Sequence, residues 1–245
     1  MIRFFENVGQ IARLIMESIY HIFRGEVEFK NTAQQMVGLG VRSIPLVLII
    51  SGFTGMVFSL QVAQELKRFG AESFIAQLLG LAIIRELGAV LTGVVVAGRA
   101  GSAIAAELGA MKVTEQIDAL KALATSPVQY LVVPRLIACM IMVPALTVFA
   151  HLIGMLGGYV VAVNQVGIVP LVYYQSSIQS ISLYDISCSL IKAAVFGIIV
   201  AIAGCYHGLT TTKGAQGVGT ATIAAVVSSM IGIFISNYFL SALMW

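Results

Sequence analysis

Five long apolar runs constrain the fold of this 245-residue chain more than any other feature of its sequence. A helix needs about 20 mostly apolar residues to cross a bilayer, and every run reaches that length. Charged residues make up only 10% of the chain, whereas soluble proteins average about 25%. We therefore predict an all-α integral membrane protein that forms a single domain over residues 1–245. The predicted transmembrane segments are 44–64, 74–98, 136–163, 187–207 and 221–243.

The first forty residues follow a different pattern. Apolar side chains recur every three or four positions from Phe4 to Ile22, and charged residues such as Arg13 and Glu17 interrupt any continuous apolar run. A secretory signal would need an uninterrupted apolar region and a small-residue cleavage site, and neither is present. The pattern predicts an amphipathic helix in the membrane interface, within residues 1–43. An amphipathic helix packed against protein is the alternative.

The placement of Lys and Arg predicts the orientation of the chain. Ten basic residues fall on one side of the membrane, whereas only Lys67 and Arg68 fall on the other. By the positive-inside rule, the N-terminus and the 99–130 segment are predicted to be cytoplasmic, and the C-terminus ends on the far side. The ten residues are Arg3, Arg13, Arg24, Lys30, Arg42, Arg99, Lys112, Lys121, Arg135 and Lys213.

Three charged residues lie well inside the predicted spans: Arg85 and Glu86 in the second and Lys192 in the fourth. Each costs about 2.5–3.5 kcal/mol at the bilayer centre on insertion scales. Adjacent residues on a helix point in different directions, so Arg85 and Glu86 cannot satisfy each other. We predict that Lys192 pairs with Glu86. The pair either holds a headgroup or transmits a state change in an apolar cavity, or it is a structural ion pair that fixes helix register.

A polar, helix-prone block at residues 98–120 separates the second and third spans. Its sequence, GRAGSAIAAELGAMKVTEQIDAL, contains Glu107, Glu115 and Asp118. A few residues of turn would be enough to connect two spans. The extra length predicts a docking surface for a partner outside the membrane.

Other patterns within the apolar runs allow two interpretations each. Phe58, Val62, Leu66 and Phe69 form a helical stripe that lines the outward mouth of a lipid-sized cavity or packs against a neighbouring helix. Small residues spaced as GxxxG predict close helix contacts, within one chain or at a dimer interface. The GxxxG pairs are Gly154 with Gly158 and Gly204 with Gly208.

His151 and the three cysteines, which have unrelated spacings, are interpreted as packing residues rather than metal ligands. The sequence has no GxxxxGK[ST] phosphate loop, no HExxH and no GxSxG. We therefore predict a transport protein rather than an enzyme, with no nucleic-acid partner. Five spans do not divide into equal inverted repeats, so a complete route requires a second copy or another subunit.

The motif GRAGSAIAAELG at residues 98–109, followed by EQIDAL at 115–120, resembles the signature of the MlaE/YrbE permease family. These proteins are the membrane subunits of the Mla and Mce ABC lipid transporters. The resemblance covers almost the whole chain, including Arg85 and Glu86 ahead of the signature. It implies a multi-pass protein of the bacterial inner membrane, with a cytoplasmic N-terminus and a periplasmic C-terminus.

The resemblance also implies partners and a substrate. The permease is expected to form a homodimer with two cytoplasmic ATPase subunits, a periplasmic hexamer of MCE-domain subunits and a small STAS-domain protein. The substrate class is phospholipid, moved between inner and outer membranes to maintain outer-membrane lipid asymmetry. ATP and Mg²⁺ bind the ATPase, so this chain is expected to hold no cofactor.

Residue roles follow from the same resemblance. The 107–125 stretch is expected to be the coupling helix that meets the ATPase, through Glu107, Glu115, Gln116, Asp118 and Leu120. Arg85, Glu86 and Lys192 match charged cavity positions, and the Phe58–Phe69 stripe is expected to carry acyl chains. Two rival classes remain: the permease of a small-solute ABC importer and a structural membrane subunit without a conduit.

Overall fold

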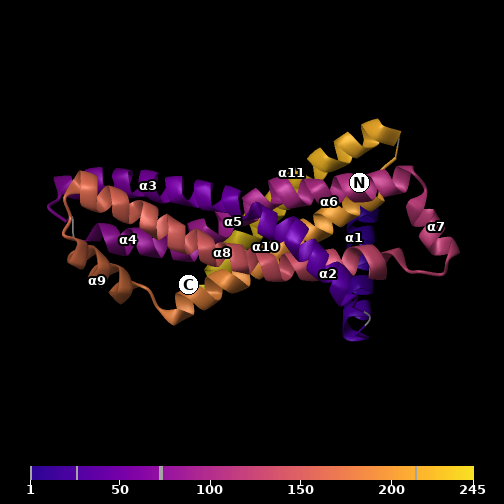
Figure 1. Cartoon of the computed structure of the whole chain (residues 1–245), viewed down its shortest axis with the longest axis horizontal. Helices are drawn as coiled ribbons and strands as arrows, with labels where there is room; N and C mark the ends of the chain where they lie inside the picture. The colour runs from indigo at the N-terminus through magenta and orange to yellow at the C-terminus, as the bar shows by residue number, and fades with distance from the viewer. Residues whose placement is uncertain (1, 26, 72–73, 213) are drawn as a thin grey trace.

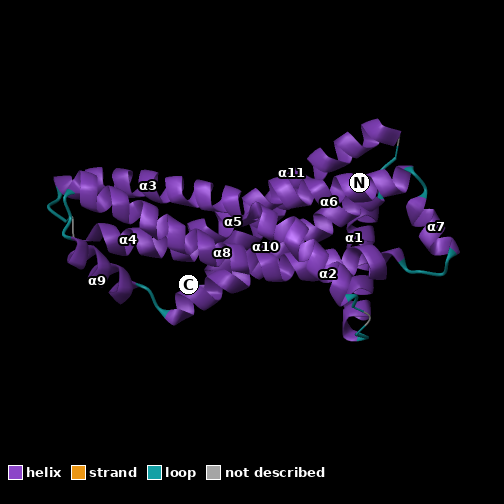
Figure 2. Cartoon of the chain, viewed as in Figure 1, coloured by secondary structure: helices purple, strands orange, loops and turns teal. Residues whose placement is uncertain are grey.

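The computed structural model describes residues 2–25, 27–71, 74–212 and 214–245, and side chains from residue 6 onward. Within these ranges the chain is helical and contains no strand (Figure 2). Helical stretches long and apolar enough to cross a membrane are Phe29–Arg68, Ile75–Val113, Val128–Val166, Leu183–Leu209 and Gly214–Met244. The predicted all-α integral membrane fold is confirmed. The predictions for Lys213 and for the side chains of Arg3 and Phe4 lie outside the described part of the chain.

Three of the long stretches join α-helical and π-helical segments without a break, and the first also includes the 3-10 helical segment η2. The first consists of α2 (Phe29–Gln35), η1 (Met36–Gly40), η2 (Val41–Ser43) and α3 (Ile44–Arg68). The second consists of α4 (Ile75–Ala82), η4 (Ile83–Leu87), α5 (Gly88–Val96), η5 (Ala97–Gly101) and α6 (Ser102–Val113). The third consists of η6 (Val128–Val132), α8 (Val133–Val161) and η7 (Ala162–Val166). The other helices are α1 (Ile2–Phe23), α7 (Gln116–Ala122), α9 (Pro170–Ser180), α10 (Leu183–Leu209) and α11 (Gly214–Met244).

The helices extend beyond the predicted spans, most of all in the second stretch. This stretch has 39 residues, which at a rise of 1.5 Å per residue gives about 58 Å. The hydrocarbon core of a bilayer is only about 30 Å thick. Residues 102–113 of the predicted 99–130 connector therefore continue the second stretch as α6, and α6 packs against α10 and α11. Hydropathy marks the apolar window of a helix but not its ends, because Ala, Glu, Met and Lys continue a helix in water.

The molecule is elongated, with α9 at one end and α7 at the other (Figure 1). One half is built from α3, α4 and the C-terminal part of α8, and the other from α5, α6, α10 and α11. The chain ends near the middle of the long axis, where α10 begins and α11 finishes (Figure 1). Two buried apolar clusters form the core, one around Phe196 and one around Leu79.

Glycines permit the closest helix contacts. A Cβ atom on Gly55 of α3 would overlap the carbonyl group of Gly154 on α8. Gly204 lies against Gly101 and Ile104. Gly154 and Gly204 each belong to a predicted GxxxG pair, so these pairs pack within one chain.

One side of α1 packs against the bundle, and the other is exposed. Leu14 and Ser18 are buried, whereas Met16, Ile19 and Tyr20 are exposed. Contacts with η6 and α10 hold the helix across the end of the bundle that carries α7 (Figure 1). The exposed apolar side chains are consistent with the predicted interfacial position, which stays a prediction.

Candidate functional site

The intramembrane charges form one cluster where η4, α10 and α11 meet. Lys192 Nζ lies 2.9 Å from Glu86 Oε1, so the predicted pairing is confirmed. The ammonium group also donates to the Arg85 carbonyl oxygen at 3.0 Å and to Ser241 Oγ at 2.7 Å. Lys192 is fully buried. Its three hydrogen-bond donors therefore all have partners, as a buried ammonium group requires.

The Glu86 carboxylate is held by α11 as well as by Lys192. Asn237 Nδ2 donates to Oε2 at 2.8 Å, and Ser241 Oγ donates to Oε1 at 2.8 Å. The Glu86 side chain nevertheless keeps 39% of its surface exposed. The carboxylate is thus fixed in position, while part of the Glu86 side chain is still accessible from outside the chain.

Arg85 forms a second ion pair in the same cluster. Its Nε donates to Asp185 Oδ1 at 2.9 Å, and the Asp185 side chain is only 4% exposed. Asp185 also closes a capping box with Ser182 at the start of α10. Sequence reasoning missed Asp185 because it falls just outside the predicted 187–207 span. The Ser-x-x-Asp signal of a capping box marks this helix start in the sequence.

Trp245 joins the two ion pairs. Its Nε1 donates to Asp185 Oδ1 at 3.0 Å. Its ring centroid lies 4.3 Å from Lys192 Nζ and 5.3 Å from Arg85 Cζ. Both cations are close enough to be attracted by the negative face of the indole. The described cluster therefore contains two acids, two bases and an aromatic ring that contacts both bases.

The local backbone and His151 support the cluster. Arg85 and Glu86 lie in the π-helical segment η4, and such segments occur often at functional sites. His151 Nε2 lies 3.2 Å from Ser189 Oγ, and its ring fills the space beside Gly88. The prediction that His151 is a hydrogen-bonded packing residue is confirmed.

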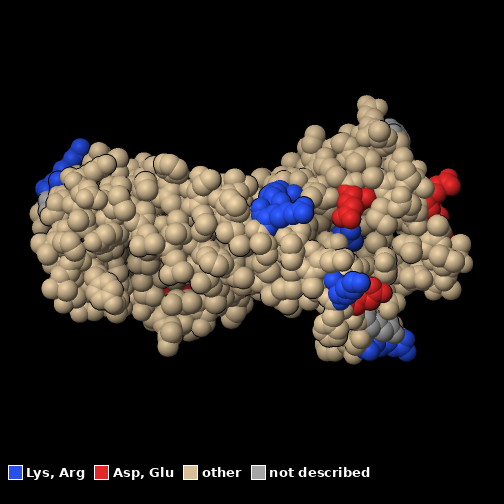
Figure 3. Space-filling model, viewed as in Figure 1, with Lys and Arg blue, Asp and Glu red and all other residues tan. Residues whose placement is uncertain are grey.

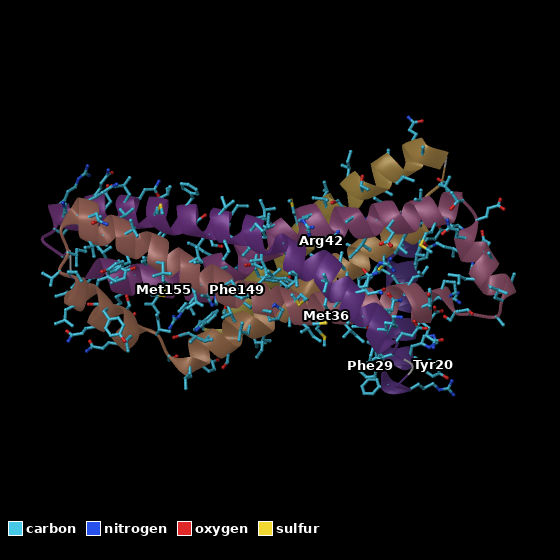
Figure 4. The ribbon with its side chains drawn as sticks, in the orientation of Figure 1. Tyr20, Phe29, Met36, Arg42, Phe149 and Met155 are labelled. Atoms are coloured by element: carbon cyan, nitrogen blue, oxygen red, sulfur yellow. The ribbon has the colours of Figure 1, made fainter. Side chains whose placement is uncertain are left out.

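An apolar cavity of about 900 Å³ lies between α8, α9 and the start of α10. Met155, labelled in Figure 4, lies on the α8 wall. Ile84 and Ile186 also line the cavity, next in sequence to Arg85 and Asp185 of the charged cluster. This half of the molecule shows little charge on the face in Figure 3. The other lining residues are Val148, His151, Leu152, Leu156, Tyr159, Pro170, Leu171, Tyr173, Tyr174, Ser177, Ile178 and Ile181.

The predicted apolar stripe lies elsewhere. Phe58, Val62 and Leu66 pack against the buried cluster around Leu79, and Phe69 is 79% exposed. None of the four residues lines the cavity. The structure therefore gives three of them a packing role within this chain, and the acyl-chain role stays a prediction.

The predicted coupling residues are divided between two helices. Residues 107–125 do not form one helix, because the chain turns at Thr114 and Glu115 and α7 starts there. Glu115 has φ 61°, in the left-handed region. The four consecutive residues 113–116 are all exposed, so none of their side chains is buried to hold a straight helix against the bundle. Ile117, 2% exposed, instead anchors α7 to the bundle.

Ion pairs fix the turn and the helix before it. Asp118 lies 3.2 Å from both Lys112 and Lys121. Hydrogen bonds from Lys112 and then Lys121 lower the pKa of Asp118 below its usual 3.8. Glu107 on α6 instead pairs with Arg135 at 2.8 Å, and the Arg135 side chain is 3% exposed. Gln116 is exposed and Leu120 is partly buried against the core.

Comparison with known proteins identifies the family. The family model described as Permease MlaE matches residues 32–243. A probable ABC transporter permease protein of Synechocystis sp. is 50% identical over 225 residues, which cover 92% of this chain and 86% of that protein. A protein of Rickettsia typhi with the same description is 42% identical over 244 residues, covering 100% and 94% of the two chains.

A plant protein is also similar. Protein TRIGALACTOSYLDIACYLGLYCEROL 1, chloroplastic, of Arabidopsis thaliana is 41% identical over 224 residues, which cover 91% of this chain and 64% of that protein. The family match spans the second, third and fourth long apolar helical stretches entirely and nearly all of the first and the fifth. This chain therefore belongs to the MlaE permease family and is a multi-pass membrane permease of an ABC transporter.

Proposed function

We propose that this chain is the permease of an ABC transporter that moves phospholipids between the inner and outer membranes and so maintains outer-membrane lipid asymmetry. The observation that carries the proposal is the charged cluster, accessible on one side, within an apolar bundle. The name of the Arabidopsis relative is that of a diacylglycerol lipid, which supports a lipid as the substrate. Ionisable residues at membrane depth mark substrate pathways by default.

The four charged side chains of the cluster differ in exposure, and the two exposed ones are available to a lipid headgroup. Arg85 and Glu86 each keep 39% of the side-chain surface exposed, whereas Asp185 and Lys192 keep 4% and 0%. The two buried partners on α10 hold the exposed pair in place. The exposed Arg85 can bind a phosphate through its remaining guanidinium N–H groups. Lipid chains then occupy the apolar surfaces on either side.

ATP hydrolysis takes place on separate cytoplasmic subunits in this proposal, which bind ATP and Mg²⁺. These subunits contact the turn and α7 through Glu115, Gln116, Asp118 and Leu120. From Val113 back to Glu86 the chain is one uninterrupted helical stretch, about 40 Å long. A push on α7 is passed through the turn to α6 and reaches the charged cluster along one continuous helical element. The π-helical segments η4 and η5 are the points where that element can change its winding.

The remaining partners complete the transport route. A second copy of the chain supplies the other half of the conduit in the inner membrane. A hexamer of MCE-domain subunits receives the lipid on the periplasmic side, which in this proposal is the end of the molecule that carries α9. A small STAS-domain protein binds on the cytoplasmic side.

The test is lipid transfer by the chain reconstituted with its ATPase in vesicles that contain a fluorescent phospholipid. Glu86→Gln and Lys192→Met are expected to assemble and hydrolyse ATP but to transfer lipid at least about tenfold more slowly, because the differential binding of lipid between states is lost. Arg68→Gln, at an exposed pair, is the control. Full transfer by both cluster variants would indicate a structural subunit. A purified complex that carries no phospholipid would indicate a small-solute importer.

A further inference from the structure

The helix α9 forms one wall of the apolar cavity and has two unlike sides. Leu171, Tyr174 and Ile178 line the cavity. Ser176 and Gln179 instead line a separate polar pocket of about 390 Å³. A helix with one apolar and one polar side lies flat at a membrane interface. The cavity therefore lies at the depth where acyl chains begin, at the end of the molecule opposite α7 (Figure 1).

The cavity is open on its α8 side. Val148, Leu152 and Leu156 line it and are 41%, 58% and 56% exposed. These side chains belong to a stretch apolar enough to cross the membrane. Among the described residues that line the cavity, none carries a formal charge at pH 7 when His151 is neutral. The opening therefore faces hydrocarbon rather than water.

Two of the hydroxyl groups in this apolar lining, those of Tyr173 and Ser177, belong to buried residues. Tyr173 OH donates to the Met155 carbonyl oxygen at 3.1 Å. Ser177 Oγ lies near the Tyr173 phenol. It is nevertheless buried and forms no hydrogen bond with another described residue. A buried hydroxyl without a partner costs about 1–3 kcal/mol. A ligand with an acceptor oxygen at this position would remove that penalty.

We propose that the cavity holds an acyl chain of a glycerophospholipid from the adjoining leaflet, with the Ser177 hydroxyl donating to the ester carbonyl oxygen. The cavity volume of about 900 Å³ is within the usual range for ligand pockets, roughly 300–1,000 Å³. This lipid is a substrate waiting for transport, and in that respect the inference rests on the proposed function. Ile84 and Ile186 connect the cavity to the charged cluster through their neighbours Arg85 and Asp185.

A transmembrane helix of a partner subunit is the rival occupant. The α9 helix covers the end of the cavity, so a helix that continued across the interface would collide with it. An acyl chain ends within the membrane, and its ester group lies at the interface beside α9. The position of Ser177 on the cavity side of α9 matches that ester group.

The experiment uses the full chain with its ATPase subunits in nanodiscs, without nucleotide. The nanodiscs contain phosphatidylethanolamine with a photoreactive diazirine in one acyl chain, and labelled peptides are mapped by mass spectrometry. We expect residues 148–159 and 171–186 to be labelled several times more strongly than the exposed apolar side of α11, which includes Ile223, Ile231 and Phe234.

Ser177→Trp fills the cavity and is expected to reduce labelling of residues 148–159 to the α11 level. Gln175→Trp is the matched control, since this residue is exposed on the same helix and does not line the cavity. Its labelling is expected to equal that of the unchanged chain. If Ser177→Trp does not fold, the map of the unchanged chain still decides the question.

Equal labelling of the cavity and α11 would overturn the proposal. Labelling that disappears when periplasmic partner subunits are added would also overturn it, because a protein segment then occupies the cavity. Labelling of the cavity in a complex that transports no phospholipid would support the site and contradict the proposed function. Transport of phospholipid by a complex whose cavity is unlabelled would support the proposed function and contradict the site.

Discussion

Lys192 Nζ and Glu86 Oε1 lie 2.9 Å apart, yet the lysine side chain is completely buried and the glutamate side chain is 39% exposed. The two residues therefore depend on each other unequally. Without Lys192, Glu86 keeps its hydrogen bonds from Asn237 and Ser241 and can still contact solvent or a headgroup. Without the Glu86 charge, the buried ammonium group has no anion in direct contact among the residues that the structure describes.

Glu86→Gln is therefore expected to destabilise the chain more than Lys192→Met. Breaking a buried ion pair by removing one partner costs about 3–5 kcal/mol, and the exposed side of Glu86 lowers the cost for Lys192→Met. The double variant is expected to lose less stability than the sum of the two single variants. Denaturation in detergent, followed by helix content, gives all three values. Equal losses for the two single variants, with additive loss in the double variant, would contradict this account.

Trp245 is the only tryptophan in the chain, so its fluorescence reports on the cluster directly. Lys192→Met removes the cation 4.3 Å from the ring centroid and is expected to shift the emission maximum. Trp245→Phe keeps an aromatic ring but removes the donor to Asp185. Hydrogen bonds to charged groups contribute about 1.5–3 kcal/mol, so Trp245→Phe is expected to lose stability in that range. Arg68→Gln, far from the ring, should leave the emission unchanged.

Gly55→Ala tests the contact between α3 and α8. A Cβ atom there would overlap the Gly154 carbonyl group, which is backbone and cannot rotate away. Overpacking of this kind costs about 1–3 kcal/mol or more. Gly219→Ala on α11 is the control, because a Cβ atom added there would meet no heavy atom within 4 Å. We expect a lower unfolding temperature for Gly55→Ala alone, measured by thermal denaturation in detergent. The same stability for both variants would show that α3 and α8 can separate without loss.

The features that could be predicted from the sequence are those set by the free-energy cost of placing individual residues in lipid. The apolar runs follow from the cost of exposing backbone and charge to lipid. The same cost required a partner for Glu86, and Lys192 was the remaining charge at a similar depth. Such inferences need only the identity of each residue and its distance along a helix. The packing of His151 and of the glycine pairs followed from the same considerations.

The contributions of α11 could not be predicted in this way. Asn237, Ser241 and Trp245 reach the cluster because α11 packs beside α10 and finishes at the depth of η4. That depth depends on how far α11 slides along its neighbour, which hydropathy does not determine. The turn at Glu115 was missed for a related reason. Its left-handed backbone conformation has no glycine to mark it in the sequence.

The pH dependence of α7 tests the interaction of Asp118 with Lys112. The pKa of Asp118 is lowered by hydrogen bonds from Lys112 and Lys121, so the ion pairs stabilise the turn above the unfolded value of 3.8. That contribution is lost as the pH falls through the lower, folded pKa. Amide hydrogen exchange in residues 113–122, corrected for intrinsic rates, is therefore expected to be independent of pH above about pH 5 and to accelerate only in acid. Acceleration near neutral pH would show that another group holds the turn.

Asp118→Arg tests whether the same ion pairs are needed to couple ATP hydrolysis to lipid transport. The substitution places a third positive charge beside Lys112 and Lys121, so α7 is expected to lose its position against α6 at every pH. Because α6 continues to the charged cluster, ATP hydrolysis should then proceed without lipid movement, while the chain stays in the membrane. Glu65→Arg reverses an exposed charge at the opposite end of the molecule and should leave transport intact. Parallel assays of phosphate release and fluorescent phospholipid transfer measure the two activities. Normal transfer by Asp118→Arg would show that the ATPase acts on the permease through a different surface.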